Sequence, residues 1–149
     1  LQRQAGRLPR ISVIMPVYRP DMGLLAEAVE SVRSQIFTDW QLCICDDGSG
    51  DDVLRRFLAD LVRNEARIRV SELSSNGGIS VASNTAAPLA DGQILLFLDQ
   101  DDLISRDCLG EFALAFATNP DLELAYSDHD KIEMDGRRHS PSFKPGWSP

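Results

Sequence analysis

The sequence predicts an α/β fold in which a mainly parallel sheet carries helices on both faces. Short apolar runs alternate four times with amphipathic helical patterns, which is typical of parallel strands joined by right-handed helical crossovers. The run at 94–98 is apolar without a break, as in strands covered on both sides. The chain has 149 residues, about the length of one domain.

The elements follow from hydrophobic periodicity and from capping residues. Strands are predicted at residues 11–17, 40–45, 68–73, 94–98 and 122–127. Pro16 should end the ladder of the first strand, the third should lie near an edge of the sheet, and the fourth should be central and buried on both faces.

Helices are predicted between these strands. Asp21 can cap the first helix, and Ser49 or Asp51 the second. The fourth helix should end at Asn119-Pro120. The expected buried stripes are Leu25, Ala28, Val29, Val32 and Ile36; Val53, Leu54, Phe57, Leu58, Leu61 and Val62; Ile79, Ala82 and Ala86; and Leu109, Phe112, Ala113 and Phe116.

The net charge of −8 argues against nucleic acid or an anionic membrane as the main partner. No apolar run approaches the roughly 20 residues of a membrane span, and no signal peptide precedes the first strand, so we expect a soluble, cytoplasmic chain. Residues 1–10 have no periodicity and are interpreted as a leader or linker.

The cysteines favour packing over chemistry. Cys43 and Cys45 alternate along a predicted strand and so face the same side, which favours a buried, reduced pair over a metal or redox role.

Polar residues follow the predicted strand ends. In a parallel sheet every strand delivers its carboxyl end to one rim, where ligands bind. The residues expected to meet at this rim are Tyr18, Asp46, Asp47, Asn76, Gly77, Gly78, Asp99, Asp101 and Asp102.

Crowded carboxylates at the end of the fourth strand predict a metal site. Asp99, Asp101 and Asp102 would repel one another unless they share a cation or hold protons. Ligands that are all oxygen, without His or Cys, suit Mg²⁺ or Mn²⁺. D-x-D alone is a weak pattern that also occurs in many surface loops.

Four blocks in order resemble a known family: ISVIMPVYRP, SVRSQIFTDWQLCICDDGSGD, NGGISVASN and ADGQILLFLDQDD. Residues 10–145 resemble the nucleotide-binding half of family 2 glycosyltransferases with a GT-A fold. YSDHDKI and FKPGWSP resemble a bacterial subgroup that builds surface polysaccharides such as O-antigen, with rhamnosyltransferase-like members. The resemblance implies metal-dependent, inverting transfer of a sugar from a UDP- or dTDP-linked donor to a saccharide or lipid-linked acceptor.

The resemblance also implies residue roles. Tyr18 would lie beside the base, and Asp47 would accept a hydrogen bond from its imide N–H. Asp99 would contact the ribose or a metal-bound water, and Asp101 would coordinate Mg²⁺ or Mn²⁺, with Asp102 tuning both. The implied sets are Pro16, Val17, Tyr18, Asp46, Asp47, Gly77, Gly78, Asn84, Asp99 and Gln100 for the nucleotide sugar, and Asp99, Asp101 and Asp102 for the metal.

The sequence departs from the family pattern in three places. Ser83 stands where many members have Arg, and Arg19 where Asn is common. The catalytic general base is expected beyond Pro149, so residues 11–149 are interpreted as a donor-binding part without the acceptor part. Asp128 and Asp130 follow the predicted fifth strand and are weaker candidates for substrate contact. A peripheral position of the full-length protein at the inner face of the plasma membrane stays open.

Several alternatives remain at this level. Asp46 can serve as a helix cap, and Gly77 and Gly78 can form only a turn. The chain can also be a non-catalytic nucleotide-sugar-binding module. A haloacid-dehalogenase-like phosphatase is a weaker alternative, since its D-x-D belongs to the first strand.

Overall fold

The computed structural model describes residues 8–133 and 135–146. They form two compact units, one ending at Thr118 and one beginning at Asn119. Most of the predicted leader, residues 1–10, lies outside the described residues. The first unit contains β1 (Ile11–Val17), α1 (Met22–Arg33), β2 (Trp40–Asp46), α2 (Asp52–Asn64), β3 (Ile68–Glu72), α3 (Ile79–Ala86), the 3-10 helix η1 (Ala87–Leu89), β4 (Ile94–Phe97) and α4 (Cys108–Thr118).

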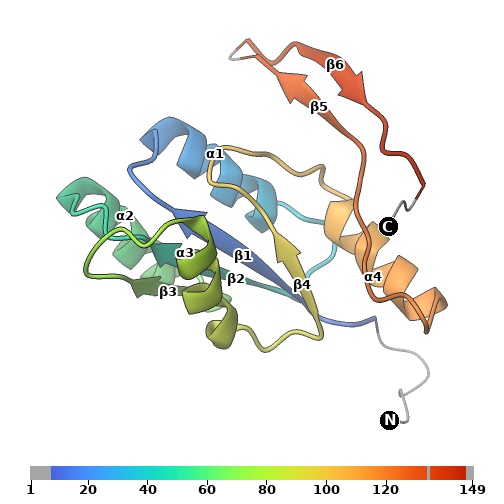
Figure 1. Cartoon of the computed structure of the whole chain (residues 1–149), viewed down its shortest axis with the longest axis horizontal. Helices are drawn as coiled ribbons and strands as arrows, with labels where there is room; N and C mark the ends of the chain where they lie inside the picture. The colour runs from blue at the N-terminus through green and yellow to red at the C-terminus, as the bar shows by residue number, and fades with distance from the viewer. Residues whose placement is uncertain (1–7, 134, 147–149) are drawn as a thin grey trace. The chain divides into compact units, whose positions relative to one another are not determined.

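The sheet of the first unit is parallel throughout, with the strand order β3-β2-β1-β4. Figure 1 shows the strands with helices on either side. The predicted α/β class is therefore confirmed, and so is the edge position of β3.

The two faces of the sheet can be read from alternate residues of the central strands. Val13 and Met15 pack in one cluster with buried residues of α1, α2 and α4. Ile14 lies in a second cluster with Cys43, Cys45 and two alanines of α3. Helices thus cover both faces, as predicted. The two cysteines share a side and are free, buried thiols, which confirms that prediction too.

β4 differs from its prediction. It is an edge strand, not a central one, because β1 is its neighbour in the sheet order and it stands last. Leu95 is 44% and Phe97 66% exposed, so only one face of β4 is covered. Its residues alternate between partly buried and exposed. An apolar run shows only that a strand is able to bury both faces, whereas the faces that are covered depend on the neighbouring elements.

Capping residues set the start of the first two helices. The Asp21 carboxylate accepts hydrogen bonds from the N–H groups of Gly23 and Leu24 at 2.8 and 3.1 Å. Asp51, not Ser49, caps α2. The predicted stripe of α1 is buried except at Ile36, which is 69% exposed because the helix ends at Arg33, before it reaches this position.

The buried stripe of α2 is narrower than predicted. Leu54 and Leu58 are buried as predicted, but Val53 and Val62 are exposed. In α4, Leu109 and Ala113 are buried, and the helix ends at Thr118, next to the predicted Asn119-Pro120 stop.

The second unit holds a hairpin of β5 (His129–Ile132) and β6 (Arg138–Ser142), paired antiparallel. The predicted strand at 122–127 is wrong, since those residues have no regular structure. The apolar pattern at 122–127 was too short to distinguish a strand from an extended connection.

Across the described residues, no helix is long and apolar enough to cross a bilayer.

Candidate functional site

The carboxyl ends of β1, β2 and β4 lie at one rim, and side chains join the loops that leave them. The Tyr18 N–H donates to the Gln100 side-chain oxygen at 2.8 Å, and the Gln100 amide nitrogen donates to the Tyr18 carbonyl at 3.3 Å. The loop after β1 is therefore held against the turn after β4.

The loop after β1 is also joined to the loop after β2. The Arg19 N–H donates to the Ser49 hydroxyl oxygen at 2.9 Å, and the Ser49 N–H donates to the Asp46 carboxylate at 3.0 Å. Arg19 has a φ of 42°, in the left-handed region that asparagine adopts more readily than arginine. This conformation would suit the asparagine that the family resemblance implies at this position.

Asp47 organises the loop after β3. Its carboxylate accepts hydrogen bonds from the Asn76 side chain at 2.8 Å and from the N–H groups of Gly77 and Gly78 at 2.7 and 2.8 Å. The residue is 2% exposed. A carboxylate offers about four acceptor positions, so about one remains for another donor.

Glycines allow the two loops to approach each other. A Cβ at Gly48 would lie 2.5 Å from the carbonyl carbon of Ser75, so the turn after β2 is packed directly on the backbone of the next loop. Gly78 has a φ of 89°, which side chains rarely adopt, and it precedes α3. The two predicted glycines thus form the turn that Asp47 binds, and a ligand role for them stays a prediction.

The acidic turn after β4 is open. Asp99, Asp101 and Asp102 are exposed, and the Asp102 N–H donates to the Asp99 carbonyl at 3.3 Å. Within residues 8–133 and 135–146, no three His, Cys, Asp or Glu side chains are placed to hold a metal ion. The carboxylate oxygens suit Mg²⁺ or Mn²⁺, whose remaining ligands are commonly waters and substrate phosphates. The donor set therefore fits such an ion, and the metal assignment stays a prediction.

The positions of two further predicted residues, Asn84 and Asp46, complete the set. Asn84 is an exposed residue of α3. Asp46, 3% exposed, points toward α2 because consecutive strand residues face opposite sides. Their predicted roles toward a ligand are not tested by these positions.

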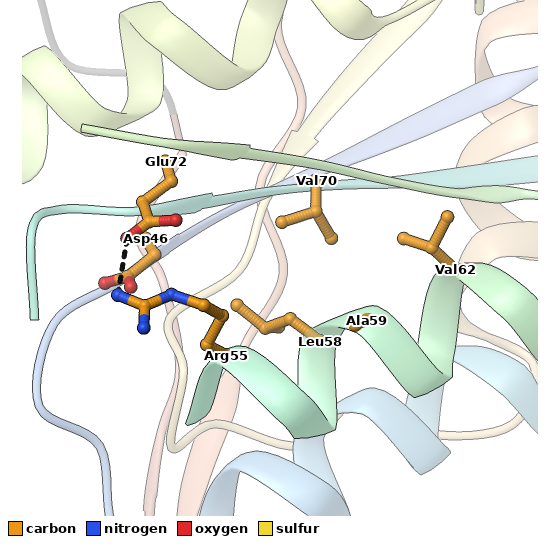
Figure 2. A pocket seen from close by; sticks show the side chains of 7 residues that line it. All are labelled: Asp46, Arg55, Leu58, Ala59, Val62, Val70 and Glu72. Atoms are coloured by element: carbon orange, nitrogen blue, oxygen red, sulfur yellow. Dashed lines mark hydrogen bonds and ion pairs between the residues drawn. The ribbon is translucent and has the colours of Figure 1, made fainter. Parts of the chain in front are cut away.

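Asp46 lines a separate cavity of about 340 Å³ between α2 and β3. Figure 2 shows its apolar side chains, among them Leu58 and Val70, with Arg55 and Glu72 at its polar end. Arg55 donates to Glu72 at 3.3 Å and pairs with Asp52, so the arginine that lines this cavity is already engaged.

The two buried thiols of β2 are not poised for chemistry. Burial raises the pKa of Cys45, a hydrogen bond with Ser71 opposes the rise, and the nearby carboxylates of Asp47 and Asp46 add to it. Burial also raises the pKa of Cys43, to about 11. Both side chains stay protonated at neutral pH, in keeping with the packing role predicted for them.

The second unit pairs its own acidic residues. Arg138 donates to both carboxylate oxygens of Asp130 at 2.7 and 3.1 Å, which lowers the pKa of Asp130. Asp128 accepts a hydrogen bond from the Lys144 N–H at 2.7 Å. These contacts give both residues a structural use within the hairpin unit.

Sequence reasoning missed the links between the loops. The sequence indicates ligand contact for Gln100 and only a capping role for Ser49. The link between Tyr18 and Gln100 has one sequence signal, Pro16. Proline has no N–H to donate, so the backbone of β1 lacks one donor just before Tyr18. For Ser49 no signal was present, because serine is common in any turn.

Comparison with known proteins places this geometry in a family. The model of glycosyl transferase family 2 matches residues 12–147. O-antigen biosynthesis protein RfbC of Myxococcus xanthus is 39% identical over 144 residues, covering 97% of this chain and 11% of that protein. The chondroitin synthase of Escherichia coli is 38% identical over 143 residues, covering 92% of this chain and 20% of the synthase.

Solved structures show the same fold. TarS 1–349 of S. aureus, crystallised in complex with UDP-GlcNAc, superposes with a TM-score of 0.65 at 30% sequence identity. The match covers 73% of this chain and 31% of the TarS chain. The chain thus spans a minor part of each of these relatives. Because the family model covers most of its length and agrees with the four blocks and the parallel sheet, the chain belongs to glycosyl transferase family 2.

Proposed function

We propose that this chain is the donor-binding part of a glycosyltransferase that takes a sugar from a UDP- or dTDP-linked donor. In the whole protein the sugar passes, with inversion, to a saccharide or lipid-linked acceptor during synthesis of a surface polysaccharide. Family membership supports the reaction class. The name of the Myxococcus relative supports the pathway, and the UDP-GlcNAc complex of TarS supports the donor class.

One observation carries the proposal: loops leaving β1, β2 and β4 are hydrogen-bonded into one rim that ends in an exposed acidic turn. Ligands of open parallel sheets bind at this rim. A preformed rim costs less ordering entropy on binding than separate mobile loops would.

Each side chain has a proposed task. The exposed ring of Tyr18 lies beside the base, and Arg19 lies over that ring, 5.3 Å from its centroid. The base imide N–H donates to the acceptor position that remains on Asp47. Asp99 faces the ribose and Asp101 the diphosphate.

Asp99 and Asp101, with Asp102 beside them, would hold Mg²⁺ or Mn²⁺ together with phosphate oxygens. When bound, the ion supplies electrophilic stabilisation of charge on the leaving nucleoside diphosphate. Three acidic residues in four positions would repel an unaccompanied diphosphate, so metal dependence is expected.

Titration calorimetry of UDP and dTDP, with Mn²⁺ and with EDTA, tests the proposal. Asp101→Asn should weaken Mn²⁺-dependent binding by about tenfold or more, since metal ligands carry effects of this size, and should leave the Tm nearly unchanged. Asp107→Asn is the matched control, because it removes one charge from the same exposed stretch outside D-x-D.

Other outcomes would point elsewhere. Equal affinities for Asp101→Asn and the unchanged chain would remove Asp101 as a ligand. Binding that ignores EDTA would end the metal part of the proposal, and no binding of either nucleotide would end the donor assignment.

A further inference from the structure

The hydrogen bonding of β1 on the side that faces β4 changes toward the rim. The Ile14 carbonyl accepts the Leu98 N–H at 3.1 Å on the β4 side, whereas the Val17 carbonyl accepts the Asp47 N–H at 2.8 Å on the β2 side. Consecutive residues of a strand direct their backbone groups to opposite neighbours, so every second residue faces the same neighbour. Pro16 and Tyr18 therefore face β4, as Ile14 does.

Pairing between β1 and β4 stops at Ile14 and Phe97, although β1 stays paired with β2 as far as Val17. Pro16 lies just beyond that point and has no N–H to donate. The next β1 residue on this side, Tyr18, has both backbone groups engaged by the side-chain amide of Gln100. The amide takes the place that a strand backbone would occupy and so bridges the gap left by Pro16.

From this geometry we propose that Gln100 is a positioning residue for donor binding. Its amide is used by Tyr18, so it acts through its neighbours: it fixes the acidic turn, and hence Asp99 and Asp101, at a set distance from the loop that carries Tyr18. The inference rests on the proposed function, because it concerns how the base-binding and phosphate-binding sides of one donor site are kept in register.

The chemistry of this position calls for glutamine. Tyr18 presents one donor and one acceptor, and a primary amide matches both. A methionine has similar length without either group. A glutamate keeps the acceptor but loses the donor and adds a fourth charge to the turn.

The chain carries a matched control at the opposite end of the same strand pair. The Gln93 side-chain oxygen accepts the Arg10 N–H at 2.7 Å, next to the start of β4 and far along the strand from the rim. Gln93→Met and Gln100→Met therefore each remove side-chain hydrogen bonding between the same two segments, and only the second does so at the acidic turn.

Two measurements on the full 149-residue chain test the inference. Amide exchange followed by NMR should show the Tyr18 N–H exchanging about tenfold faster in Gln100→Met and unchanged in Gln93→Met. Calorimetry with UDP should show about tenfold weaker binding with Mn²⁺ in Gln100→Met and a smaller loss with EDTA, because the metal-binding side is displaced from the base-binding side.

The results separate the two proposals. If the unchanged chain binds UDP and Gln100→Met binds it equally well, or if Tyr18 exchange stays within twofold, the inference is overturned while the donor assignment stands. An equal loss of binding in Gln93→Met would also overturn it, because the effect would then be general loosening. If the unchanged chain binds no nucleotide, both proposals fall.

Discussion

The Asp47 carboxylate has two roles. It accepts hydrogen bonds from Asn76, Gly77 and Gly78 in the loop after β3. In the proposed function it also accepts a hydrogen bond from the nucleotide base. A residue at a strand end is suited to both, since its backbone is fixed by the sheet while its side chain reaches the neighbouring loop. The sequence predicted that Asp47 lies at the rim. It could not show which three groups donate hydrogen bonds to the carboxylate, because they belong to a turn whose path depends on Gly48 and Gly78.

Replacing Asp47 by Asn should destabilise the fold by about 2 kcal/mol, because the new NH₂ group meets N–H donors that were paired with a buried charge. Urea unfolding at pH 7 measures the effect. Asp51→Asn is the control, since it removes a charge from the same segment but asparagine also caps helices well, so it should change stability by less than about 0.5 kcal/mol. A similar small change for Asp47→Asn would show that the loop does not depend on this carboxylate.

Helices and strands were predictable where the spacing of apolar residues alone determined the type of the element. Helices α1 and α2 start at the capping aspartates and bury the inner part of their stripes, because the 3.6-residue repeat fixes which side faces the sheet. The place of β4 was not predictable, because its apolar residues do not reveal that, among the described residues, β1 is the one strand that pairs with it. The pattern of residues within an element determines whether it is a helix or a strand. The place of a strand in the sheet depends on which other strands pair with it.

The turn before β3 is held in place by contacts of Arg67. The Arg67 guanidinium lies 3.7 Å from the centre of the Trp40 ring at the start of β2. It also donates to both carboxylate oxygens of Glu65 at 2.9 and 2.7 Å. These Arg67 hydrogen bonds lower the pKa of Glu65 from 4.5 to about 2, although burial opposes the shift.

This shift predicts a pH dependence. The folded-state pKa of Glu65 lies below the unfolded value, so its contribution to stability is present above about pH 4.5 and is lost as the pH falls toward 2. Glu65→Gln should therefore lower the free energy of unfolding by about 1 kcal/mol at pH 7, and the difference should shrink as the pH falls.

Urea titrations from pH 7 to pH 3 measure this difference. Glu27→Gln controls for the loss of one negative charge at an exposed position of α1. A Glu65→Gln difference that stays constant over the whole range would contradict the linkage.

At the scale of the molecule, the family, the parallel sheet and the position of the rim were predictable from four spaced blocks, because strand ends and turn residues are local signals. The exposure of β4 and the hairpin of the second unit were not, since both depend on which segments meet. β4 is the last strand of the sheet in the described residues, and its apolar side chains Leu95 and Phe97 are exposed, an arrangement that favours pairing between copies.

Phe97→Lys should therefore reduce concentration-dependent self-association of the chain, because a charge on an edge strand opposes strand pairing. Sedimentation velocity over a range of protein concentrations measures this. Ile36→Lys is the control, since Ile36 is similarly exposed at 69% but lies outside the sheet. Equal effects of the two changes would mean that general surface hydrophobicity, not the β4 edge, drives association.

The contact at Gly48 has a practical corollary for engineering the donor preference. Even the smallest side chain at this position collides with the main chain of Ser75, so a mutagenesis library should leave Gly48 untouched. Diversity is better placed at Arg19, whose side chain is exposed, with residues such as asparagine and glycine that adopt its φ of 42° and keep the backbone N–H that binds Ser49. A retargeted variant would then keep its scaffold while the surface offered to the nucleobase changes.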